Sequence, residues 1–113
     1  MPEEGKKSID LRKEEWIAKL KKEGRLRDPT ESHSISFKTM QLKIRRDILA
    51  FIGGGKSINE IKEAFGLNDM DAKIHLGMLE NALYIERSEQ DGVDHYFLTI
   101  FGEEHLENVE KIR

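Results

Sequence analysis

The chain has 113 residues, enough for one domain with a modest hydrophobic core but with little room for an enclosed catalytic cleft. It contains no cysteine, which excludes disulfides, thiolate metal sites and a cysteine nucleophile. No apolar run approaches the roughly 20 residues that cross a bilayer, and no signal-peptide segment is evident. We therefore expect a cytoplasmic protein with no membrane association and no enzymatic activity.

Charge is distributed unevenly along the chain. Residues 1–46 contain 13 Lys and Arg against 8 Asp and Glu, a balance of +5, whereas residues 47–113 contain 6 against 14, a balance of −8. A bound polyanion would therefore meet the N-terminal half first. The alternative is that both halves are simply solvated faces.

The first predicted element is a basic helix that Ser8 or Asp10 caps and that runs to about Glu23. Its apolar residues share one face at helical spacing: Ile9, Trp16, Ile17 and Leu20. A helix this short is unstable alone, so it must pack on the main domain or on a second copy. Residues 25–36, "RLRDPTESHSIS", have turn chemistry and are predicted as a loop. Residues 1–36 thus form a tail, a basic helix and a linker.

A second helix is predicted over residues 37–52. Its apolar residues recur at steps of three and four: Phe37, Met40, Ile44, Ile48, Phe51 and Ile52. The sequence "GGGKS" at 53–57 ends it. This segment lacks the spacer of a phosphate-binding loop and follows a helix rather than a strand, so it is predicted as a turn.

Two short helices joined by a glycine-containing turn follow. Ser57 and Glu60 form a capping box for the third helix, which Gly66 ends. Asn68 or Asp69 caps the fourth, over residues 69–82, with a predicted buried stripe of Met70, Ile74, Met78 and Leu79. Two helices with this connection are typical of a helix-turn-helix.

The remaining pattern predicts a β-hairpin and a last helix. "LYIERSEQ" and "VDHYFL" alternate as strands do, and Asp91-Gly92 between them favours a type I′ turn. Thr99 then caps a helix over residues 100–112. The fold class is therefore mainly α with a small β-hairpin: a three-helix core and a two-stranded wing over residues 37–113, with extra N- and C-terminal helices.

"HLGMLENALYIERSEQDGVDHYFLT", residues 75–99, resembles the H-L-x-x-L-E … Y-x-L-T pattern of ArsR-, MarR- and PadR-like winged helix-turn-helix transcriptional regulators. "LTIFG", residues 98–102, resembles the start of the helix after the wing, and the resemblance covers about residues 37–112. One position departs from the pattern. Leu83 stands where the family commonly has a glycine, and we expect Asn81 or a turn without glycine to make that bend instead.

The resemblance implies binding of double-stranded DNA, with the helix at 69–82 in the major groove and the hairpin on the adjacent backbone or minor groove. The expected contacts to bases or phosphates are Lys73, His75, Asn81, Lys56, Arg45, Arg46 and Arg87. Acidic residues oppose this function. Asp69 and Asp71 begin the fourth helix, and the hairpin carries four acids against Arg87 alone.

The alternative is a winged-helix module that does not bind DNA and docks through its acidic helix and wing on a basic protein partner. The four histidines are scattered without ligand spacing, so neither a metal nor another cofactor is expected.

Relatives pair through their peripheral helices, which implies a homodimer. The candidate interface residues are Trp16, Ile17, Leu20, Leu106, Val109 and Ile112.

Overall fold

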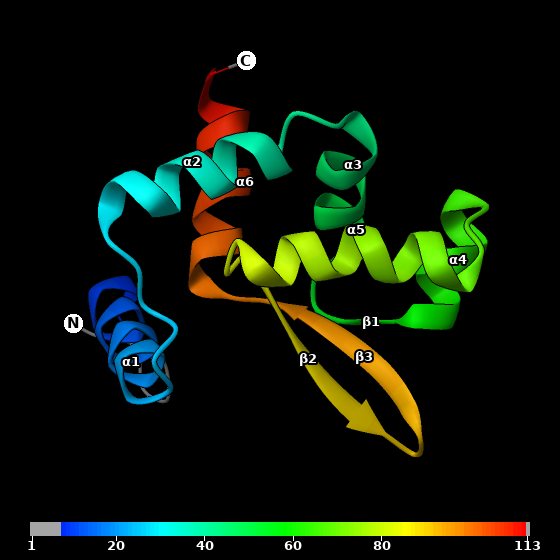
Figure 1. Ribbon diagram of the computed structural model, residues 1–113, viewed down its shortest axis with the longest axis horizontal. Coiled ribbons are helices and arrows are strands. Elements are labelled where there is room, and N and C mark those ends of the chain that lie inside the picture. The colour runs from blue at the N-terminus through cyan, green and yellow to red at the C-terminus, as the bar shows by residue number, and fades with distance from the viewer. Residues whose placement is uncertain (1–7, 113) are drawn as a thin grey trace.

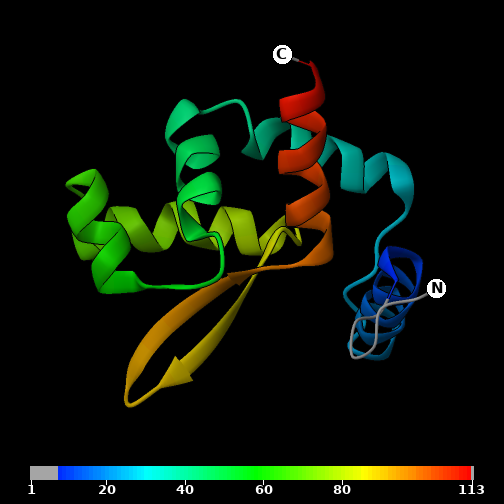
Figure 2. The ribbon, with the colours of Figure 1, turned by 180° about the vertical axis from the view of Figure 1, so that it is seen from behind.

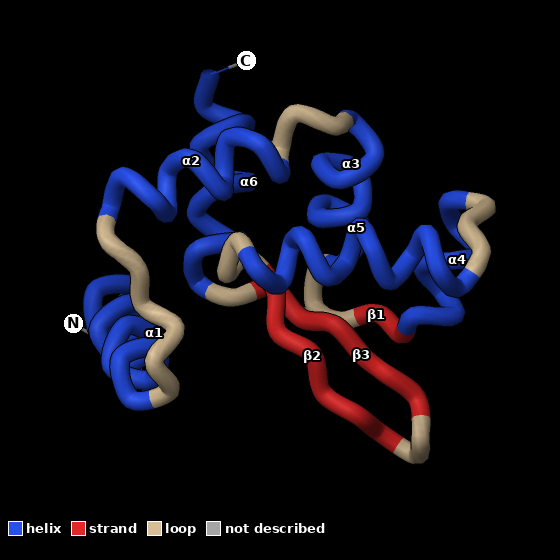
Figure 3. Tube along the Cα trace, viewed as in Figure 1, coloured by secondary structure: helices blue, strands red, loops and turns tan. Residues whose placement is uncertain are grey.

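The computed structural model describes residues 8–112, with side chains to residue 109. The elements in chain order are α1 (Ile9–Lys22), α2 (Pro29–Thr39), α3 (Lys43–Ile52), β1 (Lys56–Ser57), α4 (Ile58–Phe65), α5 (Asp69–Asn81), β2 (Ile85–Gln90), β3 (Val93–Leu98) and α6 (Ile100–Ile112) (Figures 1 and 3). No helix in the described part of the chain is long and apolar enough to cross a membrane.

Helices α3, α4 and α5 pack around the main hydrophobic core. Its buried residues are Met40, Ile48, Leu49, Ile52, Ile58, Ile61, Ala72, Leu76, Leu79, Ile85 and Tyr96. The predicted capping box is confirmed, because the Ser57 side chain accepts from the Glu60 N–H and the Glu60 carboxylate accepts from the Ser57 N–H. Asn68 is the N-cap of α5, and its side chain accepts a hydrogen bond from the Asp71 N–H. The turn between α4 and α5 contains Gly66 in the left-handed region.

The hairpin is confirmed, but the sheet has three strands rather than two. Strands β2 and β3 pair from Ile85–Leu98 to Gln90–Val93, and Asp91 and Gly92 both have positive φ, as a type I′ turn requires. The third strand is β1, which lies beside β3 and gives the order β1-β3-β2. Two residues are too few to show alternation, so sequence patterning had no signal for β1.

Helix α1 has the predicted extent, with Ser8 as its N-cap, and it packs against α6. Figure 2 shows α6 from behind, running past α2, with α1 below. A second cluster of buried residues forms at this junction: Trp16 and Leu20 from α1 with Leu83 and Ile100, and Phe101 beside them. Three ion pairs surround it, Arg12–Glu103, Lys13–Glu104 and Lys19–Glu86. Helix α1 therefore ties α6 to the start of β2.

The predicted loop at 25–36 was wrong, because most of it is α2. Asp28 accepts from the Glu31 N–H as N-cap, and Pro29 occupies the first turn, where its missing N–H is not needed. The helix predicted over residues 37–52 is accordingly two helices, with a break between Thr39 and Lys43. Arg46 stabilises that break by donating to the carbonyls of Met40 and Gln41. Phe37, the first residue of the predicted apolar face, is 61% exposed.

The bend after α5 is a turn without glycine, one of the two expected alternatives, and Leu83 rather than Asn81 makes it. The Leu83 φ of 69° is left-handed, so this residue itself makes the bend that glycine commonly makes in the family the sequence resembles. Its side chain is 5% exposed, packed within the cluster beneath α1. Thr99 supports the bend by donating to the Leu83 carbonyl and accepting from the Gly102 N–H, as expected of the α6 cap. Burial of the leucine offsets the strain of its backbone.

Candidate nucleic-acid interface

Helix α5 lies across one face of the molecule, and no described element crosses in front of it (Figure 1). Its buried face is Ala72, Leu76 and Leu79, which pack against the main core. The predicted stripe was wrong for its first two residues, because Met70 is 71% exposed and Ile74 is 52% exposed, whereas Leu79 is buried as predicted and Met78 is half-buried. Both stripes have helical spacing, but Ala72 and Leu76 continue through Leu79 to Leu83, the side of α5 that faces the rest of the chain.

Lys73 lies on the exposed side of α5, close to an acid. Its Nζ is 3.0 Å from Asp69 Oδ2, and Lys62 lies 3.6 Å from the other oxygen of that carboxylate. The hydrogen bond from Lys73 is the main reason that the pKa of Asp69 is lowered. The ammonium group is solvent-accessible, but its charge is partly balanced before any ligand arrives.

His75 is half-buried and contacts α3. Arg45 Nε donates to His75 Nδ1 over 3.2 Å, so Nδ1 carries a lone pair and the imidazole is neutral in this arrangement. Burial lowers the pKa of His75, and the Arg45 charge lowers it further, against a smaller opposite effect of Asp71. The structure thus brings together two of the predicted site residues, Arg45 and His75, on the edge of α5.

The hairpin places its single cation among acids. Arg87 lies 3.7 Å from Asp94 and 4.0 Å from Glu80, while Glu89 and Asp91 near the tip are exposed. Lys56, on β1, lies with Nζ 5.1 Å from the centre of the Phe51 ring.

Two further predicted residues have structural partners inside the chain. Arg46 holds the turn between α2 and α3 and lines the groove beside α6, rather than lying along α5. Asn81 is held by Arg27, whose guanidinium donates to the Asn81 carbonyl over 2.8 Å and to its side-chain oxygen over 2.7 Å. Arg27 escaped sequence reasoning because it lies 54 positions away, in the segment expected to be a linker.

Comparison with known proteins identifies the architecture. A possible transcriptional regulatory protein fragment from Mycobacterium bovis is similar at a TM-score of 0.69 and 17% identity, over 75% of this chain and 94% of that one. HlyU from Vibrio cholerae matches at a TM-score of 0.67 and 16% identity, over 77% and 97%. An ArsR family transcriptional regulator matches at 0.60 and 17%, over 77% and 95%. The chain has a winged helix-turn-helix fold. No protein-family model and no curated protein matches the sequence.

Within the winged-helix fold, α5 is the second helix of the helix-turn-helix and β2–β3 forms the wing. Helix α5 carries three acids and one base, and the wing from Ile85 to Leu98 carries four acids and one base. Both elements are therefore acidic, and their two cations, Lys73 and Arg87, are already near carboxylates. This surface has little long-range attraction for phosphate.

The predicted dimer residues fall into separate groups. Trp16 and Leu20 are buried within the chain, so the expectation that α1 offers them to a partner is corrected: they pack on α6 and Leu83 instead. Ile17 is half-buried. Leu106 and Val109 of α6 line a groove of about 320 Å³ together with Met40. Ile112 lies outside the residues with described side chains.

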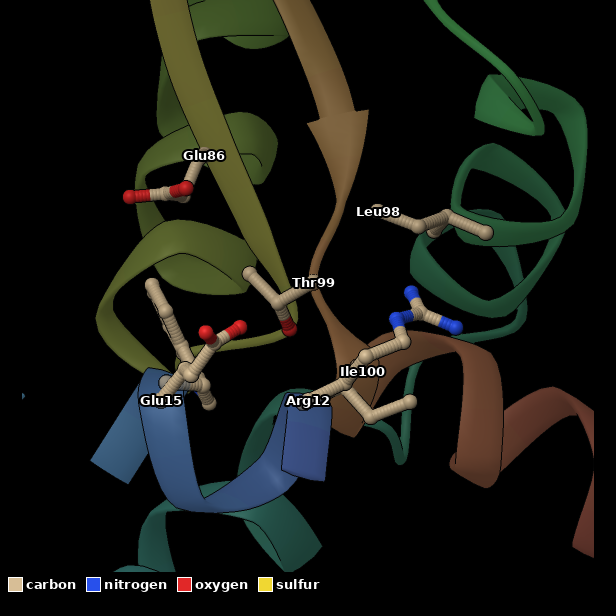
Figure 4. A pocket seen from close by; sticks show the side chains of 7 residues that line it. Arg12, Glu15, Glu86, Leu98, Thr99 and Ile100 are labelled. Carbon is tan, nitrogen blue, oxygen red and sulfur yellow. The ribbon is translucent and has the colours of Figure 1, made fainter. Parts of the chain in front are cut away.

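A shallow groove of about 450 Å³ lies where α1 meets the base of the wing (Figure 4). Arg12 and Glu15 of α1 face Thr99 and Ile100, with Glu86 of β2 further along. The groove is open to solvent, and an ion pair between Arg12 of α1 and Glu103 of α6 lies beside it. Among the described residues no three His, Asp or Glu side chains are grouped to hold a metal ion.

Proposed function

We propose that this protein is a DNA-binding transcriptional regulator that inserts α5 into the major groove and lays its wing on the flanking backbone. The observation that carries the proposal is the uncovered outer face of α5 in a winged-helix fold, whose structural neighbours include an ArsR family transcriptional regulator and a possible transcriptional regulatory protein. The N-terminal turns of such a helix reach base edges, and contacts from flanking elements to phosphates set its register.

The proposed contacts follow the residues that remain available around α5. Lys73 reaches a phosphate or a guanine edge from the exposed side of the helix, and His75 lies on the same helix beside Arg45. Lys56 and Arg87 approach from the sheet. Arg46 and Asn81 were expected as DNA contacts from the sequence. In this proposal they have structural roles instead: Arg46 holds the turn between α2 and α3, and Asn81 accepts from Arg27 at the end of α5.

A second candidate function is docking on a basic protein through the same surface. The acidic wing favours it, because Glu89 and Asp91 near the tip would repel phosphate and attract lysine or arginine. Exposed Met70 and Ile74 would supply apolar contact area for such a partner.

Titration of duplex DNA at increasing salt separates the two functions. We expect binding at low salt that weakens as salt rises, because phosphate contacts release counterions. Replacing Lys73→Ala should weaken binding by roughly three- to tenfold and reduce the salt slope by about one. Lys38→Ala, an exposed lysine on α2, is the matched control and should leave both unchanged. Failure to bind mixed-sequence duplex even at low salt would exclude the DNA function and leave the protein partner.

We also propose a homodimer, through α2 and α6 rather than α1. Phe37 is 61% exposed beside a groove of about 600 Å³ that Met40, Tyr84 and His105 also line. That groove shares Met40, Arg46 and His105 with the smaller groove along Leu106 and Val109, so apolar surface extends along α6. A two-fold partner would cover it, and a symmetric dimer matches two DNA half-sites.

A further inference from the structure

The centre of the outward face of α5 is apolar. Met70, Ile74 and Gly77 follow one another at steps of four and three, so they lie along one line of the helix, opposite buried Ala72, Leu76 and Leu79. Met70 and Ile74 are among the most exposed large apolar side chains of the described residues. Asp71 and Lys73 flank this line on its two sides. The charged residues of α5 therefore border its exposed face instead of occupying its centre.

Gly77 continues the line with no side chain at all. Glycine in a helix interior is unfavourable relative to alanine, and a Cβ added at Gly77 would meet no atom within 4 Å. Packing within the chain therefore gives no reason for glycine here. A glycine at an outward helix position is suited to close approach of another molecule to the helix backbone.

We propose that Met70 and Ile74 read thymine methyl groups in the major groove, making them specificity-determining residues. This inference rests on the proposed DNA binding and states which bases the helix selects. The thymine methyl is the one apolar group that base pairs present in the major groove, and apolar side chains are its partners. Met70 and Ile74 occupy the first two turns of α5, the part of a recognition helix that reaches base edges.

The acid beside this line fits the same surface. Asp71 can accept a hydrogen bond from the amino group of cytosine, which also projects into the major groove. Lys73 is held by Asp69 at the border, where it meets the backbone more easily than a base. Phosphate contacts contribute most of the affinity for DNA, whereas contacts to base edges select the sequence. Sequence selection by apolar side chains therefore does not require positive charge on α5 itself.

Deoxyuridine substitution tests the inference directly. The full-length protein would first select duplexes from a random library at low salt. Each thymine of the selected site would then be replaced in turn by deoxyuridine, which removes the methyl and keeps every hydrogen-bonding group. We expect a loss of affinity of about fourfold at each contacted thymine, the change that burial of one carbon group supports, and none at the others.

Four variants connect the effect to the outward face of α5. Ile74→Ala and Met70→Ala should each abolish sensitivity to deoxyuridine at a different thymine. Ile9→Ala is the matched control, because Ile9 is also 52% exposed but lies at the start of α1. Gly77→Ala should raise Tm and weaken DNA binding together, a combination that a purely structural role for Gly77 would not produce.

The outcomes separate the inference from the function beneath it. Selected duplexes that bind tightly and are indifferent to deoxyuridine would overturn thymine reading and leave DNA binding intact. Sensitivity that persists unchanged in both alanine variants would also overturn it, since other residues would then contact the methyls. Absence of any selected duplex would overturn both proposals.

Discussion

Leu83 shows how one residue reconciles an unfavourable backbone with a stable fold. A left-handed conformation costs a residue with a Cβ roughly 1–2 kcal/mol. Complete truncation of a buried leucine costs about 2–5 kcal/mol, so packing outweighs the backbone term. The sequence shows that position 83 is not glycine, but only the structure shows that α1 covers this position, where a large apolar side chain is buried.

Replacing Leu83→Gly tests that balance. We expect a net loss of about 1–3 kcal/mol in the free energy of unfolding, because the relief of backbone strain is smaller than the packing that is lost. Urea unfolding measures it. Gly66→Ala isolates the backbone term, since Gly66 has φ of 63° with open space around it, and should cost about 1 kcal/mol. A stabilised Leu83→Gly variant would show that strain dominates.

His75 makes stability depend on pH. Its pKa is lowered in the folded chain by burial and by Arg45. As the pH falls, the unfolded chain therefore binds more protons than the folded chain, and folding becomes less favourable. The contribution is fully present above the unfolded pKa of about 6.5 and is lost as the pH falls through the folded pKa. We expect the urea midpoint to fall less on acidification in His75→Gln than in the wild type. His105 changes stability with pH in the same direction, because burial lowers its pKa. Both proteins contain His105, so its contribution does not affect the comparison. His33→Gln, at an exposed position of α2, is the control. Equal pH profiles for all three proteins would contradict the effect.

At the scale of elements, a sequence motif predicted the structure correctly when it favours one structure only, and failed when it suits two. Ser57-x-x-Glu60 and Asp91-Gly92 each favour one structure, and both were confirmed. The segment "DPTE" at 28–31 suits a turn, but Asp followed by Pro is also a helix start, and that is what it is. The register of α5 could not be chosen from the sequence, because two apolar stripes have equal spacing and tertiary packing selects between them.

Arg27 connects the segment between α1 and α2 to the end of α5. The last turn of α5 has no basic residue, and Arg27 supplies the positive charge that its C-terminal carbonyls favour. Arg27→Ala should lower stability by about 1 kcal/mol and speed amide exchange at residues 79–84. Lys22→Ala, an exposed cation at the end of α1, should leave that exchange unchanged. Equal protection in both variants would show that Arg27 is dispensable to α5.

At the scale of the whole molecule, folding compensates part of the charge asymmetry of the sequence. The basic N-terminal half does not stand apart from the acidic half: Arg12, Lys13 and Lys19 of α1 pair with carboxylates of α6 and β2. The expectation that a polyanion meets the N-terminal half first relied on charges that the fold brings to acids. The number of charged residues can be read from the sequence. Which residues pair with one another cannot, because it depends on how α1 packs against α6 and β2.

The proposed dimer is tested by mass in solution. We expect light scattering at micromolar concentration to give twice the monomer mass, and Val109→Glu to give the monomer, because a carboxylate would be buried in the interface. Leu11→Glu, at an exposed position of α1, should remain dimeric. A monomeric wild type would contradict the dimer without affecting the fold.

The docking of α1 also gives the molecule a built-in optical reporter. Trp16 is the only tryptophan of the chain, and it lies at the junction of α1 with α6, edge-on to Phe101 and beside the cationic groups of Lys19 and Arg25. Its indole N–H is buried without a hydrogen-bond partner among the described residues. Tryptophan fluorescence therefore comes from the junction where α1 meets α6, and a change in its emission would record separation of α1 from that junction.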